Sequence, residues 1–225
     1  MRADRPTIVS FSGIDGAGKT TQINALIDHL RSLRLSVTLY AFWDNIVVLS
    51  RLREFLSLKA FRGEKGVGSP EKPVNRRDKN VSSWYVSVAR LFLYSLDALS
   101  LRLVVARLSR SRIDFIVFDR YIYDELANLP IGHAAVNCWV RAVLRVSPQP
   151  DVAYLLDADP ESARARKPEY PLEFVRQNRD AYLALSRLVS GMQVIAPLPE
   201  AETSSQVIKG IRSSVPLPNG RLQLE

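Results

Sequence analysis

The chain has 225 residues, a length that suits a single domain at the usual ~150 residues per domain. Hydrophobic residues make up 47% of it and charged residues 24%, so a packed core is expected, and global disorder, collagen and disulfide scaffolds are excluded. The formal net charge of +8 favours anionic partners, namely nucleic acid, a membrane surface or phosphorylated small molecules.

Short apolar runs alternate with segments of helical periodicity along the chain. In chain order we expect a strand at residues 7–12, a helix at 19–33, a strand at 36–42, helices at 46–60 and 81–108, a strand at 115–118, a helix at 134–146, a strand at 152–156, two helices that flank residues 167–171, a strand at 193–196 and a helix at 204–213. This alternation indicates an α/β domain with a mostly parallel sheet and helices on both faces.

Other segments predict surface features and location. Residues 62–80 combine glycines, prolines and charges and are expected to form a mobile surface loop, and the tail at 214–225 is expected to fray. Residues 1–6 lack the apolar core of a signal peptide, and charges interrupt the apolar stretch at 86–108. The single cysteine, Cys138, cannot form an internal disulfide. We therefore expect a cytoplasmic protein without a membrane segment.

The strongest chemical signal is a glycine-rich turn between the first strand and the first helix. Gly13-Ile-Asp-Gly-Ala-Gly-Lys-Thr20 matches the phosphate-loop pattern G-x-x-x-x-G-K-[ST] without a departure. Its glycines let backbone N–H groups point at phosphate oxygens, and the helix N-terminus adds partial positive charge. Lys19 is expected to reach the β- and γ-phosphates of ATP, and the Thr20 hydroxyl to bind Mg²⁺. The alternative is a glycine turn with a fortuitous lysine. The predicted ATP-binding residues are Gly13, Asp15, Gly16, Ala17, Gly18, Lys19, Thr20 and Thr21.

Three segments in order resemble the thymidylate kinase family of P-loop nucleoside monophosphate kinases. They are F-S-G-I-D-G-A-G-K-T-T-Q at 11–22, F-D-R-Y at 118–121 and L-D-x-x-P-E-x-x-x-x-R at 156–166, and the resemblance spans roughly residues 8–211. It implies a three-layer P-loop NTPase-type fold, with a five-stranded parallel sheet and helices on both faces. It also implies transfer of the γ-phosphate of ATP to the 5′-phosphate of dTMP with Mg²⁺.

The same resemblance implies roles for individual residues. Asp15 would meet the sugar 3′-hydroxyl of the acceptor, Asp119 would organise Mg²⁺ and its waters, and Arg120 would hold the acceptor phosphate. A lid at 159–171 would close over the phosphates with Arg164, Arg166 and Lys167. Asp119 and Arg120 follow a buried strand, at the sheet edge where ligands of such folds bind. The alternatives are a surface ion pair for Asp119 and Arg120, and a solvated helix face for the lid cations.

The chain departs from the family on the acceptor side. A-F-W-D-N at 41–45 stands where an R-E-P-G-type loop is usual, and Ala98 stands where an arginine usually reads the thymine. The segment 121–125 lacks the usual S-x-x-A-Y-Q continuation. A site built to hydrogen-bond one base rejects analogues by leaving buried polar groups unpaired, so the selectivity for thymine is left open.

Several other side chains are candidates for the acceptor site or for the core. Trp43, Phe92 and Tyr94 are assigned to acceptor binding by stacking, with core packing as the alternative. Tyr121, next to Arg120, is also assigned there. For Asp44 we weigh a Mg²⁺ or hydroxyl contact against an N-cap role. The remaining polar candidates, which we interpret as structural, are His29, His133 and Cys138, the last as a small core side chain.

These observations predict a phosphotransferase with dTMP as its acceptor. One alternative is a kinase of the same fold for another nucleotide, a nucleoside or a non-nucleotide metabolite, and another is an ATP-binding module without transferase activity. Basic segments at 62–79 and 102–112 raise nucleic-acid binding, but no nucleic-acid fold signature accompanies them. The apolar helix through 86–108 has more hydrophobic surface than one sheet face needs, and the family dimerises through such helices, so we expect a homodimer.

Overall fold

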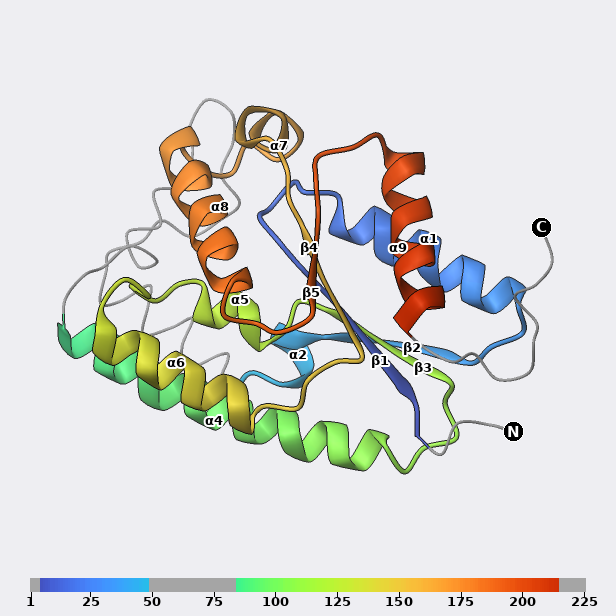
Figure 1. The fold of residues 1–225 in the computed structure, drawn as a ribbon, viewed down its shortest axis with the longest axis horizontal. Coiled ribbons are helices and arrows are strands. Elements are labelled where there is room, and N and C mark those ends of the chain that lie inside the picture. Colours follow the sequence, from blue (N-terminus) through green and yellow to red (C-terminus); the bar gives the residue numbers. More distant parts are fainter. Residues whose placement is uncertain (1–4, 49–83, 215–225) are drawn as a thin grey trace.

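The structure is a computed structural model that describes residues 5–48 and 84–214. In these ranges five parallel strands form one sheet in the order β2-β3-β1-β4-β5 (Figure 1). The strands are β1 (Thr7–Ser12), β2 (Val37–Ala41), β3 (Phe115–Asp119), β4 (Val152–Leu156) and β5 (Met192–Ile195). The expected α/β fold with a five-stranded parallel sheet is confirmed.

Helices cover both faces of the sheet. They are α1 (Lys19–Ser32), α2 (Phe42–Asn45), α4 (Trp84–Leu108), α5 (Ile122–Leu126), α6 (Ala134–Val146), α7 (Pro160–Arg166), α8 (Leu172–Ser186) and α9 (Glu200–Ser214). Figure 1 shows α1 and α9 together on one side of the sheet, with α4, α5, α6 and α8 on the other. No helix of the described ranges is long and apolar enough to cross a membrane.

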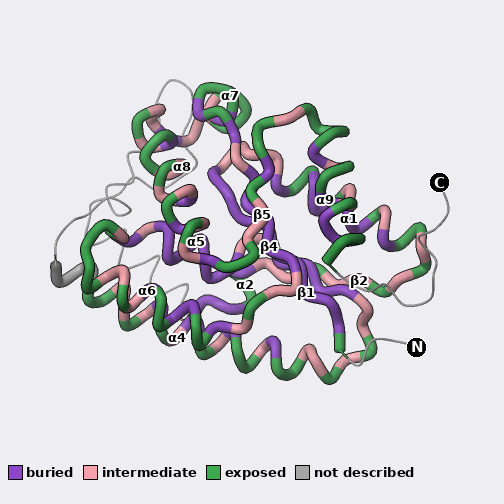
Figure 2. Tube along the Cα trace, in the orientation of Figure 1, coloured by how far each residue is buried: buried purple, intermediate pink, exposed green. Residues whose placement is uncertain are grey.

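The alternation of side chains along the strands sorts them into two cores. On β1, Val9 and Phe11 pack with α1 and α9, whereas Ile8 belongs to the core with α4, α5, α6 and α8. Successive strand residues point to opposite faces, so one continuous apolar run supplies both cores. The central strands β1, β3 and β4 are accordingly buried almost throughout (Figure 2).

Most predicted boundaries agree with the structure to within a few residues, and three expectations were wrong. The helix expected from residue 46 does not begin there, because a single turn forms earlier, at α2. After it, the N–H of Val48 donates to Asp97 on α4 at 2.8 Å. Residues 49–60 of that prediction lie outside the described residues, as does the loop expected at 62–80. The last helix begins at Glu200, four residues before its expected start. Cys138 is exposed on α6, so it is not a core side chain.

The sheet order decides which loops meet. Strand β1 pairs with β3 on one side and with β4 on the other, all parallel. The carboxyl ends of these three strands therefore lie side by side at one edge of the sheet. In open α/β sheets ligands bind at that edge, outside the ends of neighbouring strands whose connections diverge.

The contact between α9 and the sheet depends on a glycine inside the helix. A Cβ atom at Gly210 would lie 2.5 Å from the hydroxyl oxygen of Tyr154 and closer still to Gln193. That hydroxyl donates to the carbonyl of Val207 at 2.6 Å. Helix propensity favours alanine over glycine by about 1 kcal/mol, so the glycine is retained against local preference because the helix packs closely on β4.

We therefore expect Gly210→Ala to lower the free energy of unfolding by about 1–3 kcal/mol, because overpacking outweighs the gain in helix propensity. Chemical denaturation monitored by circular dichroism measures the change. Adding Tyr154→Phe, which removes the crowded oxygen, should recover part of the loss. A Gly210→Ala protein as stable as the unsubstituted chain would contradict the packing argument.

Candidate functional site

The glycine loop lies between the end of β1 and the start of α1, as the sequence predicts. Gly16 has a φ of 83°, in the left-handed region that glycine adopts without steric cost. A Cβ atom there would also collide with the carbonyl oxygen of Ala163 on α7. The loop thus packs directly against the backbone of the segment predicted to be the lid. Thr20 and Thr21 are exposed in the first turn of α1.

Lys19 is buried within this loop. Its Nζ atom donates to the carbonyl oxygens of Gly13 at 2.8 Å and Ile14 at 2.9 Å. Burial, reinforced by the nearby positive charge of Arg120, lowers the pKa of Lys19 to about 8, although three surrounding carboxylates oppose that shift. The carboxylates are those of Asp15, Asp124 and Asp119. The lysine is held inside the loop by these two carbonyl contacts.

Arg120 joins the turn after β3 to the glycine loop. Its backbone has a φ of 68°, and its N–H donates to the carbonyl of Phe11 on β1 at 2.9 Å. The guanidinium Nη2 lies 2.5 Å from a carboxylate oxygen of Asp15, and Nη1 lies 3.6 Å from Asp124. Burial acts to lower the pKa of Arg120, but Asp124 and Asp15 outweigh it and raise the pKa above the ordinary value. The alternative considered from the sequence, a surface ion pair of Asp119 and Arg120, does not form, because the guanidinium of Arg120 contacts Asp15 and Asp124 instead.

Asp124, on the short helix α5, is a site residue that sequence analysis missed. Its carboxylate is almost completely buried and accepts hydrogen bonds from the Ser12 hydroxyl at 2.6 Å, the Tyr121 N–H at 3.0 Å and the Tyr182 hydroxyl at 2.7 Å. Burial and the adjacent carboxylate raise the pKa of Tyr182 well above its usual value, so this hydroxyl stays a donor. The available signal was an acidic residue in the first turn of α5, at the N3 position, where a carboxylate can accept from the N-cap N–H.

The predicted lid cations have three different surroundings. The Nζ of Lys167 lies 3.9 Å from Asp15 and 3.3 Å from Glu169, so this lysine faces the glycine loop. The Nε of Arg164 donates to the carbonyl of Tyr170 at 3.2 Å, which orients it along its own segment. Arg166 is exposed and lines a cavity beside the loop.

That cavity has a volume of about 320 Å³ and opens between the glycine loop, the end of β4, α7 and the segment that connects β5 to α9. Its lining includes Ala17, Asp157, Ser162, Arg166, Leu198 and Thr203. Arg179 on α8 holds Asp157 with two hydrogen bonds, of 2.6 and 2.7 Å. Sequence analysis did not predict that residues 196–199 line this cavity. Only the sheet order places the segment between β5 and α9 beside the glycine loop.

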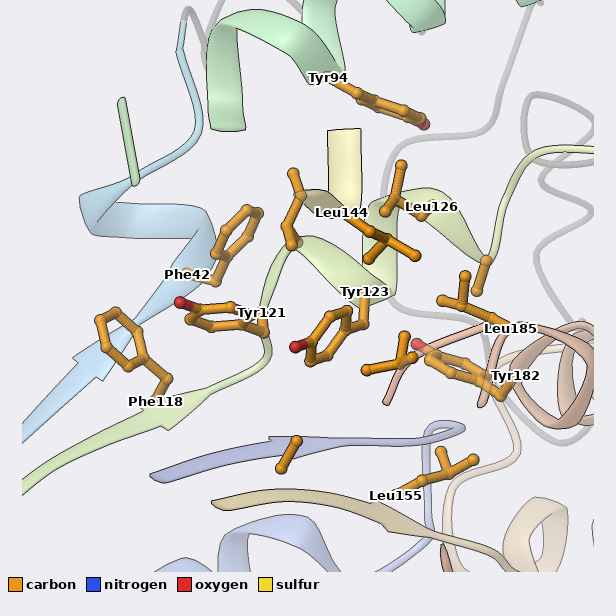
Figure 3. Packing of buried hydrophobic residues seen from close by; sticks show 14 of the residues in the cluster. Phe42, Tyr94, Phe118, Tyr121, Tyr123, Leu126, Leu144, Leu155, Tyr182 and Leu185 are labelled. Atoms are coloured by element: carbon orange, nitrogen blue, oxygen red, sulfur yellow. The ribbon is translucent and has the colours of Figure 1, made fainter. Parts of the chain in front are cut away.

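The aromatic residues assigned to the acceptor site are not brought together. Tyr121 is fully buried among Phe42, Phe118 and Tyr123, and its hydroxyl donates to the carbonyl of Pro148 at 2.7 Å (Figure 3). Tyr94 also lies in this buried cluster. Packing thus occupies both tyrosines.

Other candidates lie on the surface or in the core away from these groups. Trp43 on α2 and Phe92 on α4 are exposed, so core packing does not explain either. Asp44 is exposed inside α2 and does not cap a following helix. Ala98 is buried in the core. The described residues contain no cluster of three or more potential His, Cys, Asp or Glu metal ligands.

Comparisons with known proteins agree with this geometry. No family model matches the chain. A probable thymidylate kinase of Saccharolobus solfataricus is 27% identical over 219 residues, covering 92% of this chain and 98% of the relative. A probable thymidylate kinase of Methanocaldococcus jannaschii is 24% identical, covering 92% of this chain and 96% of the relative.

Solved structures show the same fold. The thymidylate kinase of Candida albicans superposes with a TM-score of 0.62 at 19% identity, over 93% of this chain and 92% of that one. That of Ehrlichia chaffeensis gives 0.56 at 18% identity, over 92% and 99%. The parallel sheet with a glycine loop after β1 is therefore a P-loop NTPase fold of the nucleotide kinase type. Within that class, the chain is similar in sequence and in fold to thymidylate kinases.

The pKa of Lys19 makes a prediction for the ligand-free protein. An unfolded lysine has a pKa of 10.5 and the folded one about 8, so between these values the unfolded chain holds one more proton. The free energy of unfolding should therefore rise with pH from 8 to 10.5, by about 3 kcal/mol relative to a Lys19→Met variant. Denaturant titrations of both proteins at pH 7 and pH 10 measure it. If the free energy of unfolding changed with pH equally in both proteins, burial would not lower the pKa of Lys19.

Proposed function

We propose that this chain transfers the γ-phosphate of ATP to the 5′-phosphate of dTMP. The observation that carries the proposal is the contact between Asp15 and Arg120. It brings the loop that would bind the donor phosphates and the arginine that would bind the acceptor phosphate into direct contact. Phosphoryl transfer needs in-line placement and neutralisation of charge more than covalent chemistry, and a cation beside the glycine loop supports the proposal on the second count.

The donor side has the parts that ATP requires. The loop at 13–20 presents backbone N–H groups and Lys19 to the phosphates, and the cavity of about 320 Å³ beside it has room for the adenosine. Thr20 and Asp119 offer hydroxyl and carboxylate oxygens, the ligands that Mg²⁺ prefers. Asp119 is close enough to Lys19 to raise its pKa, so both oxygen donors border the phosphate region. When bound, Mg²⁺ would neutralise charge on the phosphates.

On the acceptor side, Arg120 would exchange its ion-pair partner Asp15 for the phosphate of the acceptor. The planar guanidinium of Arg120 can bind two phosphate oxygens, so an acceptor phosphate replaces Asp15 as its partner. Asp15 then turns to the sugar hydroxyl of the acceptor. Lys167, which already faces Asp15, and Arg166, beside the donor cavity, would neutralise charge from the lid.

One observation favours a different acceptor. Ala98 occupies the position of the base-reading arginine, and it is packed in the core beside Asp97, which accepts a hydrogen bond from the Val48 N–H. No cation of α4 therefore replaces the missing arginine at that position. Another nucleoside monophosphate is the second candidate acceptor, and an ATP-binding module without transferase activity is the outcome if no acceptor stimulates turnover.

The proposal is tested by ADP release from Mg–ATP in a coupled assay. The acceptors are dTMP, the other nucleoside monophosphates and thymidine. We expect the largest stimulation with dTMP. Stimulation by another monophosphate alone would replace dTMP as the acceptor, and no stimulation by any of them, with ATP bound, would reject the transferase.

The matched blank is Lys19→Ala. Removing a charge that stabilises the transition state costs about 3–4 kcal/mol, so turnover should fall by about a hundred- to a thousandfold while the circular dichroism spectrum is unchanged. Near-normal turnover would contradict the role of Lys19.

We also propose that the chain forms a homodimer through α4. Four apolar side chains at helical spacing are exposed along this helix, namely Val88, Phe92, Leu99 and Leu103. Phe92 is the most exposed of them, at 65%. A row of exposed apolar side chains on a long outer helix is typical of a protein–protein contact.

Light scattering at micromolar concentration should give the mass of a dimer for the unsubstituted chain. Leu103→Glu places a charge in the stripe and should shift the mass to that of a monomer. The control is Leu39→Glu, which changes another exposed leucine, on β2, and should leave the dimer intact. A monomer mass for the unsubstituted chain would contradict the proposal. The cytoplasmic location stays a prediction from the sequence.

A further inference from the structure

The buried carboxylate of Asp124 has no part in the phosphate chemistry described above, yet it is one of two carboxylates that flank Arg120. It lies at the start of α5, with a side-chain exposure of 1%. A charge so far from water is costly unless hydrogen bonds compensate it. The three donors around it come from β1, the α5 turn and α8, namely Ser12, the Tyr121 N–H and Tyr182.

The two carboxylates that flank Arg120 are held differently. Asp15 belongs to the glycine loop, is partly exposed and is also 3.9 Å from Nζ of the half-exposed Lys167. Asp124 is bonded through both of its oxygens to rigid elements, and Tyr182 lies deep in the core (Figure 3). A ligand phosphate can therefore displace Asp15 from Arg120, but the position of Asp124 does not change.

We propose that Asp124, fixed by Ser12 and Tyr182, is the positioning residue that holds Arg120 ready for the acceptor phosphate. This inference rests on the proposed function, because it assigns Arg120 to the acceptor. Asp124 contacts no substrate. It acts through the guanidinium, at 3.6 Å from Nη1, and leaves Nη2 for exchange between Asp15 and phosphate.

Electrostatics agree with this arrangement. Asp124 contributes more than Asp15 to the raised pKa of Arg120, and it also opposes the lowered pKa of Lys19. The backbone at Arg120 is left-handed, with φ 68°, and the side chain lies between Asp15 and Asp124. The long side chain would otherwise lose its rotamer freedom only on binding phosphate, and Asp124 removes that entropic cost before the ligand arrives.

The decisive variant is Asp124→Asn. Asparagine keeps the shape, can still accept from Ser12 and the Tyr121 N–H, and can donate to the Tyr182 oxygen, so mainly the charge that faces Arg120 is lost. We expect KM for dTMP to rise roughly tenfold while KM for ATP changes less than about twofold. Equal changes in both KM values, or no change in either, would overturn the proposal.

Tyr182→Phe provides a second test if Asp124→Asn does not fold. It removes one hydrogen bond that fixes the carboxylate, and KM for dTMP should rise severalfold. The matched control is Tyr154→Phe, which also removes one buried tyrosine hydrogen bond, but on the opposite face of the sheet. A merely structural role predicts that both tyrosine variants lose stability and that neither changes KM for dTMP.

A readout without substrate separates this inference from the proposed function. In ¹⁵N NMR spectra of the ligand-free protein, a fixed guanidinium gives distinct Nη signals, and those of Arg120 are identified by their loss in Arg120→Lys. We expect them to merge in Asp124→Asn, while those of Arg179, held by Asp157, are unchanged. Unchanged Arg120 signals overturn the positioning role. Absence of acceptor-stimulated turnover in the unsubstituted chain overturns the proposed function, whatever these signals show.

Discussion

The ion pair between Asp15 and Arg120 depends on the strand order, and the rest of the site depends on the ion pair. Because β1 lies between β3 and β4, the loop after β1 and the turn after β3 emerge side by side. A carboxylate on one and a guanidinium on the other then meet at 2.5 Å. The parallel sheet thereby converts two short motifs, more than a hundred residues apart, into one charged centre.

That centre concentrates opposite charges in partly buried surroundings. Lys19 and Arg120 lie among Asp15, Asp119 and Asp124, and the pKa values of both cations respond to these carboxylates. Such an arrangement is costly in the ligand-free protein, as the lowered pKa of Lys19 shows. The same cost makes the site ready for an anion, because phosphate oxygens can take the place of the carbonyl oxygens that now accept from Lys19.

The two sides of the site differ in how closely they follow the family. On the donor side, the glycine loop matches its pattern, and it packs against the backbone of α7. On the acceptor side, α4 presents Ala98 to the core, and Tyr121 is used for packing. The departures from the usual motifs at residues 41–45, 98 and 121–125 therefore concern the groups that would recognise the base, whereas the loop that would bind phosphate matches its pattern. The chain is thus similar to thymidylate kinases over most of its length, and its departures from their usual motifs lie in the segments expected to bind the acceptor.

The sequence by itself determined the order of the strands along the chain and the chemistry of the phosphate loop. Runs such as Thr7–Ser12 and Val152–Leu156 were predicted at their observed bounds, since buried parallel strands are continuous apolar segments. Helix α9 was predicted to begin four residues late, because its polar first turn has no apolar periodicity. The tertiary structure alone decided that Asp124 and Tyr182, 58 residues apart, share a hydrogen bond. It also buried Tyr121 and exposed Phe92. Local patterns specify which face of an element is apolar, but contacts between distant segments depend on how the sheet is assembled, and no local pattern encodes that.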